Sequence, residues 1–419
     1  MLKASLSKSF VNNSTPLGLP LLLFTLLGIY TIQSMVGMFA FQGVPAILRA
    51  EGISTTTIGV LYLIMLPWAL KFLWAPKVER YRQSSQSFTP YIKLTFIGNT
   101  LLALIFIMLT FISLKVSFLW VFAILMLMAL IPTVVDIAGD GFAVEQLSHK
   151  NHSLGNIMQV GGSYLGALIG GGLFIYWVAN YNWHIALYLL AAITFLMAIL
   201  VIPLKNTSPK KQDNSEPVLP SIKRAWQNSS IRKTLFFVAL SQAGTRLVLA
   251  MMMPFFIDQG LALADLGLLA AGGGAPAGIV GVLIGGFLSR HFGTEKMLTV
   301  MLWLEIVCFI FFLFFFWDLF PDSLEEITLM SLFVISSMVF SAKFVVLYTL
   351  MMHRSTGDQP GVNFTLFQSV DSAVAIITAM IGGWVITQWS YTAHFSVAIV
   401  LTVFSLLVIT FSKPFLTKR

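Results

Sequence analysis

The sequence carries little charge and a single cysteine. Asp, Glu, Lys and Arg make up 10% of its 419 residues, whereas about 25% of a soluble protein is charged. Cys308 has no second cysteine to pair with, so an intrachain disulfide is excluded. The chain also lacks a G-x-x-x-x-G-K-[ST] phosphate loop, metal-ligand spacing of His and Cys, and an evident Ser–His–Asp set. These absences exclude direct use of ATP through such a loop, and we expect no enzyme activity, no cofactor and no bound metal.

Long apolar stretches fill most of the chain. Apolar residues make up 57% of the sequence, and each stretch is close to or above the roughly 20 residues that cross a bilayer. The pattern predicts an all-α membrane protein with twelve transmembrane helices in two six-helix bundles. The stretches lie near 20–48, 54–75, 91–114, 118–147, 153–179, 184–204, 231–257, 265–289, 296–317, 326–352, 361–388 and 392–412.

Basic residues are sorted to one side of these stretches. If both termini share a side, only Arg49 and Lys115 among the basic loop residues lie on the other. The positive-inside rule then places both termini and the central loop in the cytoplasm. The formal charge of +8 therefore reflects topology, and no nucleic-acid partner is expected. The apolar run beginning near residue 20 is too long for a signal-peptide core and is interpreted as a retained first span.

A polar stretch divides the chain into two halves. Residues 205–230 contain three prolines and several basic residues, which is typical of a flexible linker. We therefore expect an N-terminal six-helix bundle over 1–204, a cytoplasmic linker over 205–230 and a C-terminal six-helix bundle over 231–419. A weak internal repeat supports this division, because basic turns at 75–82 and 285–293 occupy matching places in the two halves.

Two parallel six-span halves and these turns resemble the major facilitator superfamily. The residues Gly286, Arg290 and Gly293 are similar to its cytoplasmic loop motif, whereas the first copy has Glu79-Arg80 where Asp-Arg is usual and lacks the flanking glycines. The resemblance implies the major facilitator fold, with a substrate site near the midplane between the halves.

A narrower resemblance rests on four stretches. The stretches 66–76, 136–144 and 363–371 are similar to the group that contains muropeptide permeases, acetyl-coenzyme A transporters and a bacterial siderophore-uptake branch of rhizobactin- and pyochelin-importer type. The run Leu154-Gly-Asn-Ile-Met-Gln-Val-Gly-Gly162 is most similar to the siderophore branch.

Charged residues inside the spans are candidates for function, because each costs a few kcal/mol in the bilayer. Arg246 and Lys343 lie near mid-span, and two cations there suit an anionic ligand; the Arg fork binds a carboxylate or phosphate bidentately. The alternative is internal pairing, for example Lys343 with Asp371 or Arg246 with Asp136. For Glu305, a local structural partner is favoured over a role in transport.

Carboxylates supply candidates for proton coupling or gating. Asp136 and Asp140 lie on one helix face at i, i+4 spacing. Either they pair with Lys71, Lys77 or Arg80 and latch the cytoplasmic side, or one of them takes up a proton during transport. The full set of coupling or gating candidates is Asp136, Asp140, Asp371, Lys71, Arg80 and Arg290.

Amide and phenol side chains complete the candidate binding site. A buried amide in a membrane bundle also serves as a link between helices, so both interpretations stay open. The candidates for ligand contact are Gln33, Gln159, Gln242, Gln368, Tyr30 and Tyr164. Glycines at four-residue spacing (162, 166 and 170; 274 and 278; 281 and 285) predict smooth strips on the fifth and eighth helices. The family resemblance implies that these two helices meet across the halves, where such strips would let the bundles rock.

These features predict a multi-pass secondary transporter of the bacterial inner membrane. We expect it to act as a monomer in the lipid bilayer and to import a small polar, anionic solute by proton-coupled alternating access. The branch resemblance and the two cations favour a siderophore, as its iron chelate. The alternatives are a muropeptide or other cell-wall fragment, export of a drug or siderophore, and a membrane sensor that binds a ligand without transport.

Overall fold

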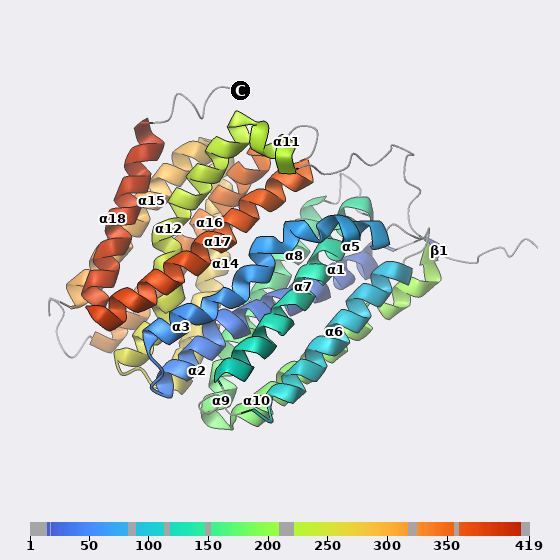
Figure 1. The fold of residues 1–419 in the computed structure, drawn as a ribbon, viewed down its shortest axis with the longest axis horizontal. Helices are drawn as coiled ribbons and strands as arrows, with labels where there is room; N and C mark the ends of the chain where they lie inside the picture. The colour runs from blue at the N-terminus through green and yellow to red at the C-terminus, as the bar shows by residue number, and fades with distance from the viewer. Residues whose placement is uncertain are drawn as a thin grey trace, which may run out of the picture.

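The computed structural model describes residues 15–16, 18–82, 89–112, 118–146, 152–208, 222–316, 325–355 and 360–411. Within these ranges, twelve helices are long and apolar enough to cross a membrane. They form an elongated all-helical body in which the helices of the first half lie beside those of the second (Figure 1). The predicted all-α fold with twelve spans is confirmed.

The first half begins with a short parallel pairing of β1 (Thr15–Pro16) with β2 (Thr207–Ser208), which holds the start of the first span beside the end of the sixth. Its helices are α1 (Leu19–Met38), η1 (Phe39–Gly43), α2 (Val44–Ala50), α3 (Thr55–Leu61), η2 (Tyr62–Met65), α4 (Leu66–Leu70), η3 (Lys71–Leu73), α5 (Ala75–Arg82), α6 (Thr89–Leu109), α7 (Phe118–Gln146), α8 (His152–Ala167), η5 (Leu168–Leu173), α9 (Phe174–Asn180), α10 (Trp183–Ile199) and η6 (Ile202–Asn206).

The second half begins with a short helix after the central loop. Its elements are α11 (Ile222–Gln227), α12 (Ser229–Asp258), α13 (Leu263–Leu268), η7 (Leu269–Gly274), α14 (Ala275–Phe292), α15 (Thr294–Phe315), α16 (Glu325–Arg354), α17 (Pro360–Gln388) and α18 (Tyr391–Phe411). The predicted linker falls largely on 209–221, which lies outside the described residues, so the division into two domains stays a prediction.

Three spans change their winding at corresponding depths. The elements η1, η5 and η7 are π-helical turns within longer helices, and such turns interrupt the regular hydrogen-bond ladder. Pro45 and Pro276 each follow a π turn as one of the first residues of the next α-helix, where a missing N–H is tolerated. The second span changes between α-helix and 3₁₀-helix around Pro67, with Lys71 at the start of η3.

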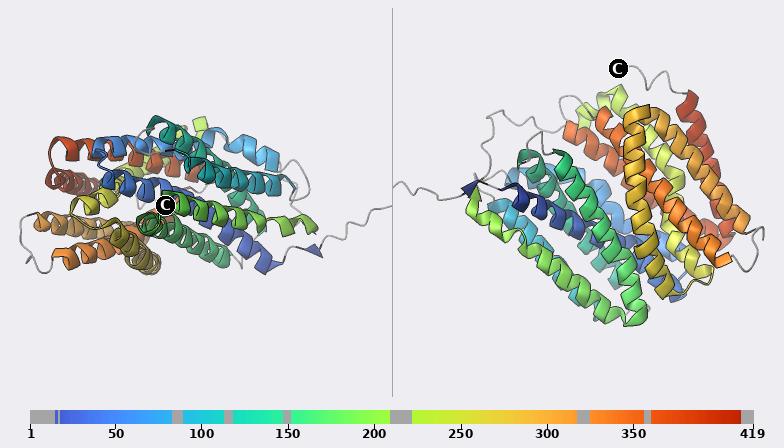
Figure 2. Two further views of the ribbon diagram at one scale, coloured as in Figure 1. Left: turned by 90° about the horizontal axis from the view of Figure 1, so that it is seen from below. Right: turned by 180° about the vertical axis from the view of Figure 1, so that it is seen from behind.

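We call the helix ends that adjoin the central loop the linker end, and the opposite ends the far end. The second span follows α17 along its length, because α3, η2, α4 and η3 all contact α17. The fifth and eighth spans meet mainly toward the far end, through η5 and α9 against α13 and η7. The view from behind in Figure 2 shows green helices of the first half beside the gold helix of the eighth span.

Four-residue glycine strips pack mainly inside the halves. A Cβ at Gly162 or Gly166 would collide with the backbone of α1, and a Cβ at Gly281 or Gly285 with that of α16. Gly278, which faces Tyr164 of α8, is an exception. The prediction that these strips join the two halves is therefore wrong for most of their glycines, because helix rotation directs them to a neighbour in their own half.

Different glycines bring the fifth and eighth spans together. A Cβ at Gly267 would lie 2.6 Å from the Tyr176 backbone nitrogen, and a Cβ at Gly172 would collide with Ala271. These glycines lie in or beside the π turns, where close approach of two backbones requires the absence of a side chain.

Candidate functional site

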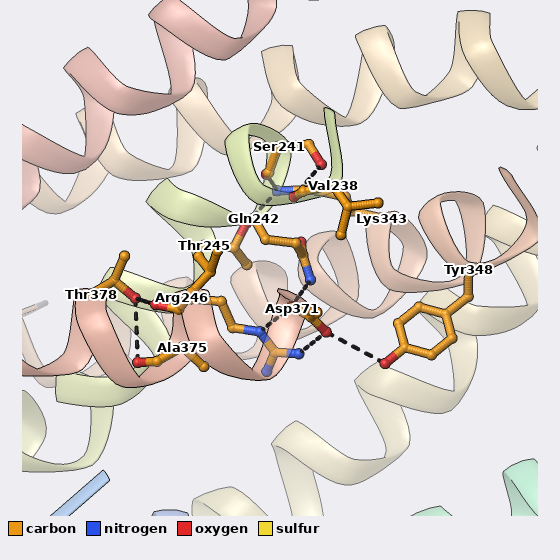
Figure 3. A network of polar contacts seen from close by, with 11 residues as sticks. Val238, Ser241, Gln242, Thr245, Arg246, Lys343, Tyr348, Asp371, Ala375 and Thr378 are labelled. Carbon is orange, nitrogen blue, oxygen red and sulfur yellow. Dashed lines mark hydrogen bonds and ion pairs between the residues drawn. The ribbon is translucent and has the colours of Figure 1, made fainter. Parts of the chain in front are cut away.

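The Asp371 carboxylate on α17 receives a bidentate guanidinium from Arg246 on α12. The Arg246 Nε donates to Oδ1 at 2.9 Å and Nη2 to Oδ2 at 2.5 Å (Figure 3). The Asp371 side chain is 2% exposed, whereas that of Arg246 is 21% exposed. A planar fork of this kind binds a carboxylate strongly and with fixed geometry. The Arg246 guanidinium is thus held by an internal carboxylate while part of its side chain remains accessible.

Other side chains surround the same pair. Gln242, one turn before Arg246 on α12, donates from Nε2 to Asp371 Oδ1 at 2.9 Å, and the Tyr348 hydroxyl lies 3.4 Å from Oδ2. The Arg246 guanidinium carbon lies 4.6 Å from the centre of the Phe344 ring, as in a cation–π contact. The carboxylate therefore has three polar partners, of which the tyrosine contact is the longest.

A second ion pair lies in the first half. Lys71 Nζ donates to Asp136 Oδ2 at 3.1 Å, and both side chains are less than 10% exposed. The pairing of Asp136 with Lys71 is one of the two arrangements open from the sequence.

Lys343 lies in a separate, enclosed cluster. Its ammonium donates to Glu305 Oε2 at 2.7 Å, to the Ser241 carbonyl at 2.5 Å and to the Thr245 hydroxyl. An ammonium has three N–H donors, so this set uses all of them, and Lys343 is 1% exposed. In this conformation Lys343 presents no donor to a ligand.

The observed pairs differ from those considered as examples from the sequence. Lys343 bonds Glu305 and not Asp371, and Arg246 bonds Asp371 and not Asp136. The cause is helix rotation, because α12 turns Thr245 toward α15 and the neighbouring Arg246 toward α17. Glu305 does have the local partner that was expected for it.

Two tyrosine candidates take different positions. Tyr164 on α8 is half-buried and contacts Gly278 of α14, so it reaches across the halves. Tyr30 on α1 is 5% exposed and packs beside Gly162 within the first half.

The four glutamine candidates also lie in different surroundings. Gln242 joins the Asp371 cluster. Gln33 borders a small gap with Asn99 and Pro132 inside the first half. Gln159 is exposed, and Gln368 is half-buried on α17, one turn from Asp371.

The remaining gating candidates lie at the linker end. Arg80 and Arg290 are exposed there. The Asp140 side chain lies outside the described residues, so its pairing stays a prediction.

A polar contact between the halves at the far end was missed. Arg49 at the end of α2 donates from Nε to Asp258 Oδ1 at 2.5 Å, and Tyr391 donates to Asp258 Oδ2 at 2.7 Å. We call Arg49, Asp258 and Tyr391 the far-end latch. The sequence did contain a signal for this contact, because Arg49 is one of only two basic loop residues on the side opposite the termini.

Threonines strengthen the contact between the halves near the same end. Thr55 Oγ1 donates to the Gly383 carbonyl at 3.0 Å and lies 2.8 Å from Thr387 Oγ1. Thr56 Oγ1 donates to Thr387 Oγ1 at 2.8 Å. The far end of the second span is thereby tied to that of α17.

Twelve candidate spans in the described residues, with ion pairs held between them, are the architecture of a polytopic membrane protein. A family profile described as "Major Facilitator Superfamily" matches residues 22–372. The chain belongs to this superfamily and is a secondary transporter.

Curated relatives are distant. An uncharacterized protein of Haemophilus influenzae is 26% identical over 61% of this chain and 62% of its own length. The anhydromuropeptide permease of Escherichia coli K12 is 24% identical over 60% of this chain and 52% of its own length. The chain therefore spans between about half and two thirds of the length of these relatives.

A solved structure shows the same fold. The crystal structure of the nucleoside transporter NupG superposes with a TM-score of 0.67, at 12% identity, over 95% of this chain and 99% of that one. At this identity the likeness concerns the fold alone.

Proposed function

We propose that this transporter imports a cell-wall muropeptide, or a similar carboxylate-bearing fragment, across the bacterial cytoplasmic membrane. The observation that carries the proposal is the Arg246–Asp371 fork, in which the Arg246 side chain stays partly exposed. A ligand carboxylate competes with Asp371 for the same two donors, which links binding to rearrangement of α12 against α17. The relationship to an anhydromuropeptide permease supports the choice of ligand.

The siderophore reading has less support. It rested on the branch resemblance and on two cations available to one anion. The relatives reported above include a muropeptide permease, and in this structure Lys343 is enclosed with all three of its donors used. A muropeptide requires only one such cation for each carboxylate that it places there. We therefore rank the muropeptide above the siderophore, and both above an exporter or a sensor.

The proposed cycle is proton-coupled alternating access. The positive-inside distribution puts the linker end and the termini in the cytoplasm, and the latch end then faces outward. With Arg49 bonded to Asp258 across the halves, the outward end is held closed. Import requires that these contacts break so that the ligand enters from outside.

Transport into proteoliposomes tests the proposal. Purified protein is supplied with labelled anhydromuropeptide or with a panel of labelled ferric siderophores, with and without an imposed proton gradient. We expect gradient-driven uptake of the muropeptide that a protonophore abolishes and that Arg246→Ala reduces at least tenfold. The matched control is Arg354→Gln, which removes an arginine bound to Glu295 at the linker end.

Each outcome bears on a different part of the proposal. Uptake of a ferric siderophore but not of the muropeptide would show that the substrate is a siderophore instead. Muropeptide uptake that is unaffected by the protonophore would refute proton coupling and leave the substrate in place. Equal loss in the Arg246 and Arg354 variants would refute the assigned role of the Arg246 fork.

A further inference from the structure

The Glu305–Lys343 pair lies outside the substrate site proposed above. Glu305 on α15 and Lys343 on α16 are 0% and 1% exposed. Thr245 on α12 donates to Glu305 Oε1 at 2.6 Å, so each carboxylate oxygen accepts one hydrogen bond. The cluster is internal to the second half and fully bonded.

Stability gives no sufficient reason for such a pair. Removing two charges from water has a large desolvation cost, and well-packed apolar replacements are often equally stable or more so. Charges in the bilayer interior are accordingly rare and mark ion or proton pathways. We therefore expect a Lys–Glu pair enclosed among three spans to have a role in transport.

Helix α12 connects this pair to the Arg246 site. Ser241 and Thr245 contact Lys343, whereas the adjacent residues Gln242 and Arg246 contact Asp371 (Figure 3). A change of charge at either cluster is therefore felt at the other through one helix and a medium of low dielectric constant.

Charge balance shows what the second pair adds. Arg246 with Asp371 and Lys343 with Glu305 give two positive and two negative charges. A ligand carboxylate bound at Arg246 gives this set of groups a net charge of −1. A proton on Glu305 restores neutrality and leaves the Lys343 ammonium to attract Asp371, which releases the Arg246 donors for the ligand.

We propose that the Glu305–Lys343 pair carries the transported proton, with one proton taken up for each ligand carboxylate bound at Arg246. An O–H bond forms at a Glu305 carboxylate oxygen with a proton from the outer solution, and the same bond breaks toward the cytoplasm; no other covalent bond changes. This inference rests on the proposed proton-coupled import. It assigns coupling to residues other than Asp136, Asp140 and Asp371.

The test separates coupling from binding. Glu305→Gln has the charge of the protonated Glu305 and leaves the Lys343 ammonium to attract Asp371, so we expect this variant to exchange labelled anhydromuropeptide across proteoliposomes at a rate within about threefold of wild type. Gradient-driven accumulation should fall at least tenfold, and ligand-induced proton uptake should disappear. The control Glu295→Gln/Arg354→Met removes a 2.6 Å pair from the same two helices and should change neither.

A second variant covers failure of Glu305→Gln to fold. Glu305→Asp keeps a carboxylate but moves it away from Lys343, and a proton carrier so altered should shift the pH midpoint of accumulation relative to wild type. Folding of each variant is checked by size-exclusion elution in detergent.

The outcomes are distinct. Wild-type accumulation in Glu305→Gln, or an unchanged pH midpoint in Glu305→Asp, would overturn this inference and leave the import proposal standing. Exchange lost together with accumulation in folded Glu305→Gln would show that the pair serves binding, and would also overturn it. Wild-type protein that ignores the proton gradient would overturn the proposed coupling, and this inference with it.

Discussion

Neutralising Asp258 is expected to loosen the far end. Asp258→Asn keeps the side-chain volume and a hydrogen-bonding oxygen for Tyr391, but it removes the charge that faces Arg49. The two paired side chains are 26% and 19% exposed, so solvent screens part of their attraction. A pair of this kind contributes up to about 1 kcal/mol, and loss of the charge-assisted hydrogen bond brings the total to about 1–2 kcal/mol.

This energy acts on the balance between far-end-closed and far-end-open states. Because the latch joins the halves only in the closed state, its loss raises the open-to-closed ratio by a factor of roughly 5–30. The change should appear as faster access from the outer side to residues buried between the halves. Thermal stability of each half should change little.

Thiol labelling measures this access. The native Cys308 is replaced by Ser, and Ala46→Cys on α2 supplies the reporter; Ala46 is fully buried in an apolar cluster with Leu247 and Val248 of α12. A membrane-impermeant maleimide is added from outside, and we expect Asp258→Asn to raise the labelling rate by the factor given above. An increase below twofold would refute the role of the latch.

The matched control for the latch is a pair within one half. Glu295→Gln removes the partner of Arg354 between α15 and α16 at the linker end. Since this pair does not join the halves, the variant should label at the unmodified rate. An equal rise in this control would mean that loss of any surface ion pair opens the protein, and the reasoning from the latch geometry would fail.

Three further perturbations follow from the contacts. Gly172→Leu should block closure of the far end, because even a Cβ collides with the eighth span there, and outer-side labelling of the Ala46→Cys reporter should rise. Arg246→Lys keeps a positive charge facing Asp371 but loses the bidentate guanidinium. The contact with the ligand should weaken by about 1.4 kcal/mol, so the ligand concentration for half-maximal uptake should rise about tenfold. Lys71→Ala strands a buried carboxylate at Asp136 at a cost of about 3 kcal/mol, which should lower the melting temperature in detergent, while Lys71→Met/Asp136→Asn should restore most of it.

The spans were predictable from sequence because hydrophobic length alone defines them. A stretch such as 296–317 must cross the membrane as a helix, since the bilayer leaves its backbone groups no other partners. The structure places a helix at Thr294–Phe315. The ends of the spans also follow from the length of the apolar stretches, and they differ from the predicted ranges by only a few residues.

Side-chain partners were not predictable to the same degree. Each depends on the rotation of a helix about its axis, and adjacent residues on a helix differ by about 100°. Thr245 and Arg246 illustrate the point, because they serve two separate clusters although they are neighbours in sequence. The apolar composition of these helices carries little periodic signal that would fix their rotation, so Lys343 could not be separated from Arg246 as a ligand candidate.

The two ion pairs that contact α12 impose a condition on any transport cycle. In a medium of low dielectric constant, a net charge gained at Arg246 without compensation is costly. Asp371 compensates the guanidinium when no ligand is bound, and a ligand carboxylate that displaces it leaves Asp371 unpaired. A second titratable group within electrostatic reach removes that penalty, and Lys343 with Glu305 is positioned to supply it through the same helix. Binding of an anion and uptake of a proton then become favourable together and unfavourable singly, which is the thermodynamic requirement for symport.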